Sequence, residues 1–335
     1  MNINFYFTLF SNCIPVKGAV RSIICDLQRG SYLFISNDIF DVLTSCQTMP
    51  IFKILDYYRN INEVELEILF NQLIEHNLGH YCENPDRFPK INTQFNSPYE
   101  ILDCIIELSD CNLKYIDNIF ESLTILGCQT IEFRTYSHFS IEKMEIFLSK
   151  LHLTRIRNVE LIVCHSELES LNAFEAILKK YPIIETLVIH SADIDSCKTI
   201  GASNLIFTTQ KITSSSCCGN ISKEDFKINL PFYLHGLKNN TCLYRKISIK
   251  ANGDITNCPS LEKTFGSVIN LSLEQALNTI GFKELWSIKK DDINICKVCE
   301  FRYICSDCRA FLNDVYEKPF KCSYDPYSPS FHNLS

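Results

Sequence analysis

Short apolar runs separated by polar turns fill the first 90 positions of the chain. Runs at 4–10, 20–26 and 31–35 predict strands, and residues 28–31 predict the turn that joins the last two. The apolar spacing then becomes helical: Asn37 is expected to cap a helix through Cys46, and a second helix follows Pro50. With a third helix after it, this order predicts an N-terminal winged-helix domain at 1–90.

The third helix is predicted to begin near Asn62 and to stop at Gly79. Its expected apolar face is formed by Val64, Leu66, Ile68, Leu69, Leu73 and Ile74. The same helix carries four acidic residues, Glu63, Glu65, Glu67 and Glu75. Because these carboxylates would repel phosphates, nucleic acid is disfavoured as a partner.

A winged helix without a basic helix has two remaining interpretations. It can bind a peptide that adds a strand beside 31–35, or it can serve only as an N-terminal cap. The order of its elements resembles the leader-peptide recognition elements of enzymes that modify ribosomally made peptides. That resemblance implies a precursor peptide as partner.

After three prolines, Pro85, Pro89 and Pro98, strands and helices alternate. Strands are predicted at 101–107, 130–134, 158–164, 185–190 and 204–208, and helices at 114–126, 141–150 and 169–180. Repeated strand–helix units favour parallel strands with right-handed crossovers. Since the units are too few for a closed eightfold barrel, the fold class is α/β, with a partial (β/α) barrel or an open sheet at 97–210, followed by a linker at 211–241.

Seven cysteines dominate the rest of the chain. They read Cys242-x10-Gly253-x4-Cys258, then Cys296-x2-Cys299-x5-Cys305-x2-Cys308, and finally Cys322. Pairs spaced as C-x-x-C are typical of zinc and iron–sulfur ligands, whereas cysteines of an apolar core do not repeat in this way. A metal-binding domain is therefore predicted at 242–325, with a tail at 326–335. It should contain a hairpin turning at 251–253 and a helix capped by Ser272 and Gln275.

Composition and charge restrict the partners and the cell compartment expected for this chain. A net charge of −7 provides no basic field, and no apolar run is long enough to span a membrane. The apolar N-terminus lacks the basic lead of a signal peptide and is interpreted as a strand. Eighteen cysteines without an export signal predict reduced thiols in the cytoplasm.

The cysteine pattern resembles the SPASM domain, which carries two auxiliary [4Fe–4S] clusters in radical S-adenosylmethionine peptide-modifying enzymes. The third interval is x2 here and x3 in the family. The resemblance implies that Cys242, Cys258 and Cys308 hold a first cluster. It implies a second cluster on Cys296, Cys299, Cys305 and Cys322.

Two cubes require eight ligands, and the pattern supplies seven. Cys217 or Cys218 can provide the eighth, His235 is a poorer donor, and an open iron site that binds substrate or solvent is equally allowed. Zinc is the alternative metal. The x5 interval between the C-x-x-C pairs is, however, shorter than the usual gap of about 15–20 residues between the pairs of a zinc site.

The segment after the strand predicted at 101–107 resembles the radical S-adenosylmethionine motif, in which three cysteines hold a reducing cluster. Cys111 matches the first position, but the next two are Tyr115 and Asn118. Neither side chain replaces a thiolate, so this cluster and S-adenosylmethionine cleavage are expected to be absent. Cys111 can equally be an ordinary loop cysteine. No set of residues defines a general base or nucleophile, so no catalytic residue is predicted.

The C-terminal segments 308–319 and 321–327 resemble the SPASM proteins of grasp-with-spasm systems. In those systems an ATP-grasp ligase joins side chains of a ribosomally made peptide. The resemblance implies a peptide maturase that works with such a ligase and a precursor peptide. Two alternatives remain open: a redox enzyme that modifies the peptide through an open auxiliary cluster, and a zinc-binding winged-helix regulator.

Overall fold

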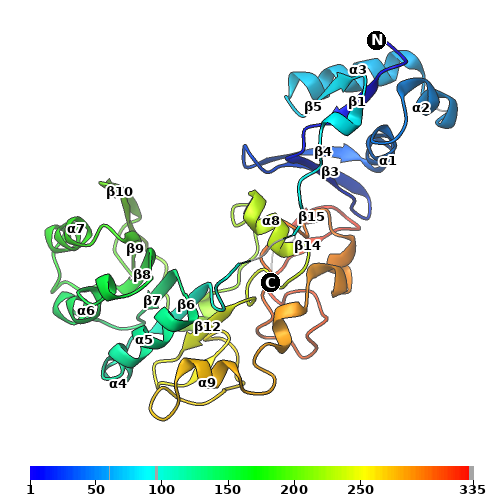
Figure 1. The fold of residues 1–335 in the computed structure, drawn as a ribbon. Coiled ribbons are helices and arrows are strands. Elements are labelled where there is room, and N and C mark those ends of the chain that lie inside the picture. The colour runs from blue at the N-terminus through cyan, green and yellow to red at the C-terminus, as the bar shows by residue number, and fades with distance from the viewer. Residues whose placement is uncertain (60, 95–96, 332–335) are drawn as a thin grey trace. The chain divides into compact units, whose positions relative to one another are not determined.

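The chain folds into two compact units, each assembled from separate stretches of sequence. The computed structural model describes residues 1–59, 61–94 and 97–331 (Figure 1). The first unit contains Met1–Phe95, Asn220–Thr241 and Ile288–Ser335, and the second contains Asn96–Gly219 and Cys242–Ser287. The end of the predicted tail, 332–335, lies outside the described residues. No helix in the described stretches has the length and apolar character needed to cross a bilayer.

The first unit begins with strands followed by three helices, as predicted, but it also contains the strands Cys13–Val16 and Gly79–Cys82, which were not predicted. Strands β2, β3 and β4 form an antiparallel sheet in which β4 is an edge strand, and β1 pairs with β5. The elements are β1 (Tyr6–Leu9), β2 (Cys13–Val16), β3 (Arg21–Asp26), β4 (Ser31–Ser36), α1 (Asn37–Cys46), α2 (Ile51–Tyr57), α3 (Glu63–Glu75), β5 (Gly79–Cys82) and the 3-10 turn η1 (Pro85–Arg87).

Two predicted helix boundaries were wrong. The Ser36 hydroxyl caps α1, so Asn37 is the first helical residue and not the cap. Helix α3 begins directly after Asn62, close to its predicted start, but ends at Glu75, and Gly79 belongs to β5. Gly79 lies in a strand because β5 returns to pair with β1, a contact that the local sequence does not encode.

The buried face of α3 also differs from the prediction. Leu66, Phe70 and Leu73 are buried, at the spacing of one helical face, whereas Val64 and Ile68 are exposed. The Phe70 ring stacks on Phe7 of β1 with centroids 4.2 Å apart. This pair forms the centre of the N-terminal core, to which the predicted face had not assigned Phe70.

The second unit confirms the α/β fold class. An eight-stranded sheet has the order β10-β11-β9-β8-β7-β6-β12-β13, in which the edge strands β10 and β13 are antiparallel to their neighbours and the six strands between them are parallel. The open order fits the predicted partial (β/α) barrel. The elements are β6 (Asp103–Glu107), α4 (Asp110–Leu113), α5 (Ile116–Leu126), β7 (Thr130–Arg134), α6 (Ile141–Leu148), η2 (Leu151–Leu153), β8 (Asn158–Cys164), α7 (Leu171–Lys180), β9 (Ile184–His190), β10 (Ser196–Ile200), β11 (Ser203–Phe207), η3 (Ser215–Cys217), β12 (Lys246–Ile249), β13 (Ile255–Thr256), α9 (Leu273–Leu277) and η4 (Glu284–Ser287).

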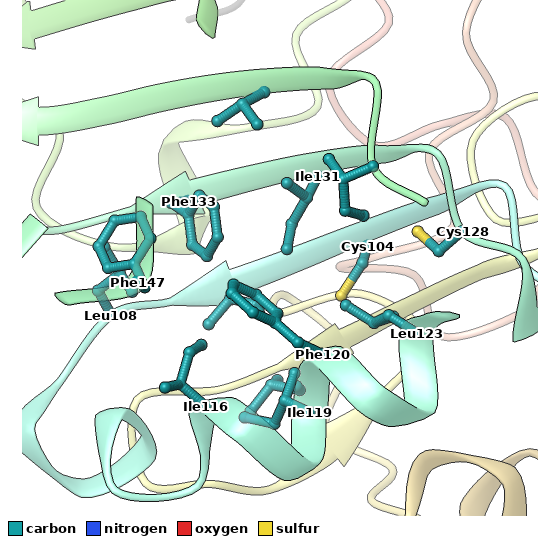
Figure 2. Close-up of a cluster of buried hydrophobic side chains, with 14 of the residues drawn as sticks. Cys104, Leu108, Ile116, Ile119, Phe120, Leu123, Cys128, Ile131, Phe133 and Phe147 are labelled. Carbon is teal, nitrogen blue, oxygen red and sulfur yellow. The ribbon is translucent and has the colours of Figure 1, made fainter. Parts of the chain in front are cut away.

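The two faces of this sheet differ in chemistry. Apolar side chains of α5, α6 and α7 pack against one face, where Phe120 of α5 approaches Phe133 of β7 (Figure 2). Side chains alternate along a strand, so the residues between these buried ones point to the other face. There Glu132 and Arg134 form an ion pair, and Glu132 lies in register with Glu160 of β8. The sheet thus presents a polar face on the side away from its helices.

The compact units group residues differently from the predicted domains. Strand β12 pairs in parallel with β6, which brings 242–287 into the unit of the large sheet. Residues 288–335 instead belong to the unit of the N-terminal strands. Part of the predicted linker is ordered as helix α8 (Leu230–Gly236), whose Tyr233 is buried. The remaining elements of the first unit are η5 (Lys290–Asp292), η6 (Ile295–Val298), β14 (Tyr324–Asp325) and β15 (Ser330–Phe331).

Candidate metal centres

Four of the predicted ligands line one cavity in the first unit. They are Cys296, Cys299, Cys305 and Cys322, the set to which the SPASM resemblance assigns the second cluster. Cys296 lies in η6, and the next two follow it in tight turns in which the Cys299 N–H donates to the Cys296 carbonyl at 3.0 Å. The backbone around Ile221 reaches Cys322 through an isolated parallel bridge.

The walls of this cavity are largely apolar. Ile221, Phe226, Phe301, Tyr324 and Phe331 line it together with the four cysteines. Burial raises the pKa of the Cys305 thiol to about 12, and Lys290 opposes this shift. Burial also raises the pKa of Cys299 well above its ordinary value. Such thiols stay protonated unless a cationic centre binds them, so metal binding here would release protons.

A buried ionic network supports one side of the cavity. Lys290, which lines it, is 2% exposed, and its Nζ lies 3.4 Å from an Asp307 carboxylate oxygen. Arg309 pairs with the same carboxylate at 2.5 Å, and the Asn240 amide donates to it at 2.9 Å. Two cations therefore share one carboxylate, which leaves positive charge beside the cysteines.

The N-terminal sheet contributes to the same site. Arg21 of β3 pairs with Glu300 at 2.8 Å, and the Tyr324 hydroxyl donates to that carboxylate at 2.5 Å. The Phe301 ring contacts both Tyr32 of β4 and Phe226, with centroids 5.4 and 4.8 Å away, and the Tyr32 and Phe226 rings are 6.5 Å from each other. The winged-helix sheet, formed by β2, β3 and β4, thus packs directly against the cysteine segment 296–324. The sequence did not predict this relationship.

The donor set fits an iron–sulfur cube. Four cysteine thiolates are the usual ligands of a [4Fe–4S] cluster, and each binds a different iron. In the described stretches no three His, Cys, Asp or Glu side chains converge closely enough to hold a single metal ion. A cube requires its sulfurs to surround a larger volume than one ion occupies, which is compatible with four cysteines lining one cavity.

The second unit brings together a separate set of thiols. Cys242 and Cys258 flank the β12–β13 hairpin, which was predicted to place them near each other. Burial raises the pKa of Cys258 to about 12, and Cys242 is the next largest contribution to that rise. Cys308 belongs to the first unit, so its assignment to the first cluster stays a prediction.

The region that resembles the radical S-adenosylmethionine motif is built as a capped turn. The Ser109 and Asn112 side chains form a capping box at the start of α4, and the Cys111 thiol donates to the Asn252 carbonyl at 3.8 Å. Tyr115 packs against the core, and Asn118 is exposed on α5. Neither residue is a thiolate donor.

Several charged residues of these sites carried no sequence signal. Lys290 lies in the polar run Lys289–Asp292, which resembles an exposed segment, yet it is buried. Arg134 and Asp307 are each two positions from their ion-pair partner in the sequence, Glu132 and Arg309, and are buried beside cysteines or their supporting residues. Only the tertiary contacts distinguish them from surface charges.

Comparisons with known proteins give limited information. No family model matches the chain, and no curated protein matches it. Among solved structures, SuiB from Streptococcus suis bound to S-adenosylmethionine is 12% identical, with a TM-score of 0.40 over 90% of this chain and 95% of that chain.

Two further SuiB structures are also similar. SuiB bound to the precursor peptide SuiA is 12% identical, with a TM-score of 0.42 over 93% of this chain and 98% of that chain. A third SuiB structure is 10% identical, with a TM-score of 0.32 over the same shares of both chains. Scores this low do not establish a shared fold, so the function of this chain is inferred from its own residues.

Proposed function

We propose that this chain is an iron–sulfur protein that takes part in the maturation of a ribosomally made peptide, together with an ATP-grasp ligase and without cleaving S-adenosylmethionine. The observation that supports this most directly is the cavity lined by Cys296, Cys299, Cys305 and Cys322. These residues would hold one [4Fe–4S] cluster. Cys242, Cys258 and Cys308 are proposed to hold another.

A bound cluster of this kind supplies one-electron redox chemistry and ties together the segments that ligate it. The surrounding residues perform the other tasks. Phe301 and Ile221 exclude water from the cysteines, and Lys290 offsets the negative charge of a thiolate-bound cluster. Arg21 and Glu300 connect the cysteine segment to the winged-helix sheet.

The winged-helix sheet is proposed to bind the precursor peptide. Among residues 1–59, 61–94 and 97–331, β4 pairs with β3 alone, so its other side is available for an added strand. Phe34 on this strand is 40% exposed. A peptide strand beside β4 would place a side chain against Phe34, since directly opposed side chains in a sheet contact each other.

Metal analysis tests the cofactor part of the proposal. Anaerobically purified protein should contain about eight irons and matching acid-labile sulfide, as two [4Fe–4S] cubes require. Cys299→Ala should lose about four of them, because one thiolate of the second cube is removed. Two zincs without sulfide would contradict the proposal and support the zinc-binding alternative.

Peptide binding and ligase association test the remaining part. A labelled precursor peptide should bind the wild-type protein in a fluorescence-anisotropy titration, and the ATP-grasp ligase should co-purify with the complex. Phe34→Ser should weaken peptide binding, whereas Phe52→Ser on α2 should not. Phe52 is a matched control because it is 43% exposed and lies away from β4. Equal affinities of the two variants would count against β4 as the docking strand.

A further inference from the structure

A groove in the second unit runs between α5 and the segment that leads into α9. Its volume is about 490 Å³, and its lining includes two isoleucines, Ile125 and Ile269, that are 67% and 55% exposed. Among the described residues that line it, Glu121 and Glu274 are charged and none is basic. The groove therefore combines exposed apolar surface with negative charge only.

The two carboxylates of the groove differ in their contacts. The Ser122 hydroxyl donates to Glu274 Oε2 at 2.8 Å, which fixes this carboxylate at the start of α9. Glu121 is exposed on α5, and its carboxylate makes no hydrogen bond or ion pair within residues 1–59, 61–94 and 97–331. A cation on a partner surface can therefore pair with Glu121 without displacing an existing contact.

An apolar knob lies at the other end of α9. Ile280 is 97% exposed, at the tip of a turn in which the Phe282 N–H donates to the Thr279 carbonyl at 3.1 Å. Gly281 has a φ of +87°, which glycine adopts without strain, and the Phe282 side chain is fully buried. The turn is thus anchored in the core and holds the Ile280 side chain out in solvent.

Two lysines flank this knob. Lys263 and Lys283 border the surface around Ile280. Lys283 pairs with Glu100 at 2.7 Å, and Lys263 pairs with Glu284 at 3.1 Å, both on the exposed surface. Because water and ions screen exposed pairs, either lysine can exchange its partner for another carboxylate at little cost.

The groove and the knob lie at opposite ends of α9. Ser272 and Leu273 line the groove at the start of this helix, whereas Leu277, its last residue, borders the knob surface. At about 1.5 Å of rise per residue, the five residues of the helix span roughly 8 Å. The exposed positions along it, Gln275 and the C-cap Asn278, are uncharged. Two α9 helices packed antiparallel about a two-fold axis would therefore bring each knob to the groove of the other copy.

We propose that this chain forms a two-fold symmetric dimer in which α9 of one copy packs antiparallel to α9 of the other. Ile280 of each copy enters the groove of the other copy, and the two flanking lysines then face the two groove carboxylates. Such an interface closes on itself, because each copy supplies one knob and one groove. The inference is independent of the proposed function, since none of these residues is a proposed cluster ligand.

Sedimentation velocity on the full chain, purified anaerobically, tests the dimer at increasing protein concentration. The wild type should shift from monomer to dimer, and Ile280→Asp should weaken this association about tenfold to a hundredfold, because an apolar side chain is lost from a buried position. Leu168→Asp is the matched control and should dimerise as the wild type does, since Leu168 is 81% exposed and lines neither surface. A wild type that stays monomeric at every concentration would overturn the inference.

Charge reversal tests the pairing of lysines with carboxylates. Glu121→Lys and Lys283→Glu should each weaken dimerisation at least about tenfold through repulsion between like charges, and the double variant should recover most of the lost affinity. A double variant as weak as the two single changes combined would overturn the pairing. Far-ultraviolet circular dichroism checks that each variant is folded.

Two more measurements separate the dimer from other uses of the groove and from the proposed function. If the chain is monomeric and Glu121→Lys instead weakens its association with the ATP-grasp ligase, the groove holds a basic segment of that partner and the dimer is overturned. Iron and sulfide should be equal in the wild type and in every variant. Wild-type protein that dimerises but contains no iron would refute the proposed function and support the dimer.

Discussion

Removing the Asp307 carboxylate should strongly destabilise the first unit. This side chain is fully buried, and Lys290 and Arg309, which pair with it, are nearly so. Asp307→Ala would leave two buried cations without their shared counter-charge. Removing one partner of a buried ion pair costs about 3–5 kcal/mol, so the ratio of folded to unfolded protein should fall at least about a hundredfold, at about 1.4 kcal/mol for each power of ten.

The destabilisation caused by Asp307→Ala should depend on whether the second cluster is bound. Lys290 interacts electrostatically with Cys305 and Cys296, the proposed ligands of the second cluster. A bound anionic cluster would give Lys290 a second counter-charge, so the loss of stability should be smaller in cluster-loaded protein than in protein without metal. Urea unfolding under anaerobic conditions, followed by far-ultraviolet circular dichroism, measures the free energy of unfolding of the cluster-loaded and the metal-free protein.

An exposed ion pair in the same unit provides the matched control. Asp41 pairs with Lys17 at 2.6 Å, and both side chains are 45% exposed. Asp41→Ala should cost less than about 1 kcal/mol, because water and ions screen such pairs. If Asp307→Ala in metal-free protein lies within about 1 kcal/mol of Asp41→Ala, the role assigned to the buried network is refuted.

Three further predictions follow from individual contacts. Phe70→Ala should lower the free energy of unfolding by about 3–5 kcal/mol, because it removes a buried ring stacked on Phe7. An unfolding temperature equal to that of the wild type would contradict this prediction. Cys111→Ala should leave iron per chain unchanged, whereas a loss of about four irons would reveal a cluster at the degenerate motif. Lys290→Met should retain iron but shift the midpoint potential of the second cluster to more negative values, because a buried cation beside it is lost; an unchanged potential in a redox titration would contradict this.

Local signals explain which elements were predictable. The capping boxes at Asn62 and Ser272 start helices α3 and α9 as expected, because each cap is formed within a few residues of sequence. Strands β7 and β8 have the predicted bounds, since their apolar runs end at polar turns. The predictions that were wrong, such as the end of α3, depended on a strand pairing between residues far apart in the chain.

In the candidate sites, too, local signals were predictable and contacts between distant residues were not. The resemblance to the SPASM pattern grouped the four cysteines that line the cavity of the first unit, whereas spacing alone would have paired Cys305 with Cys308. Spacing did not distinguish Cys217 from Cys218, whose sulfurs contact the Lys211 carbonyl and Arg134 respectively. It also gave no indication of Lys290, whose burial depends on packing against segments that lie elsewhere in the sequence.

The sequence by itself determined most of the helices and most of the strands, though not β2, β5 or β10, together with the α/β class and the cysteines that carry the candidate chemistry. These properties follow from periodicity, capping and spacing, which act over a few residues. Only the tertiary structure decided that β12 joins the large sheet beside β6 and that Phe301 packs against the winged-helix sheet. Such contacts depend on which apolar surfaces and backbone edges meet when the whole chain folds, and that information is distributed over residues far apart.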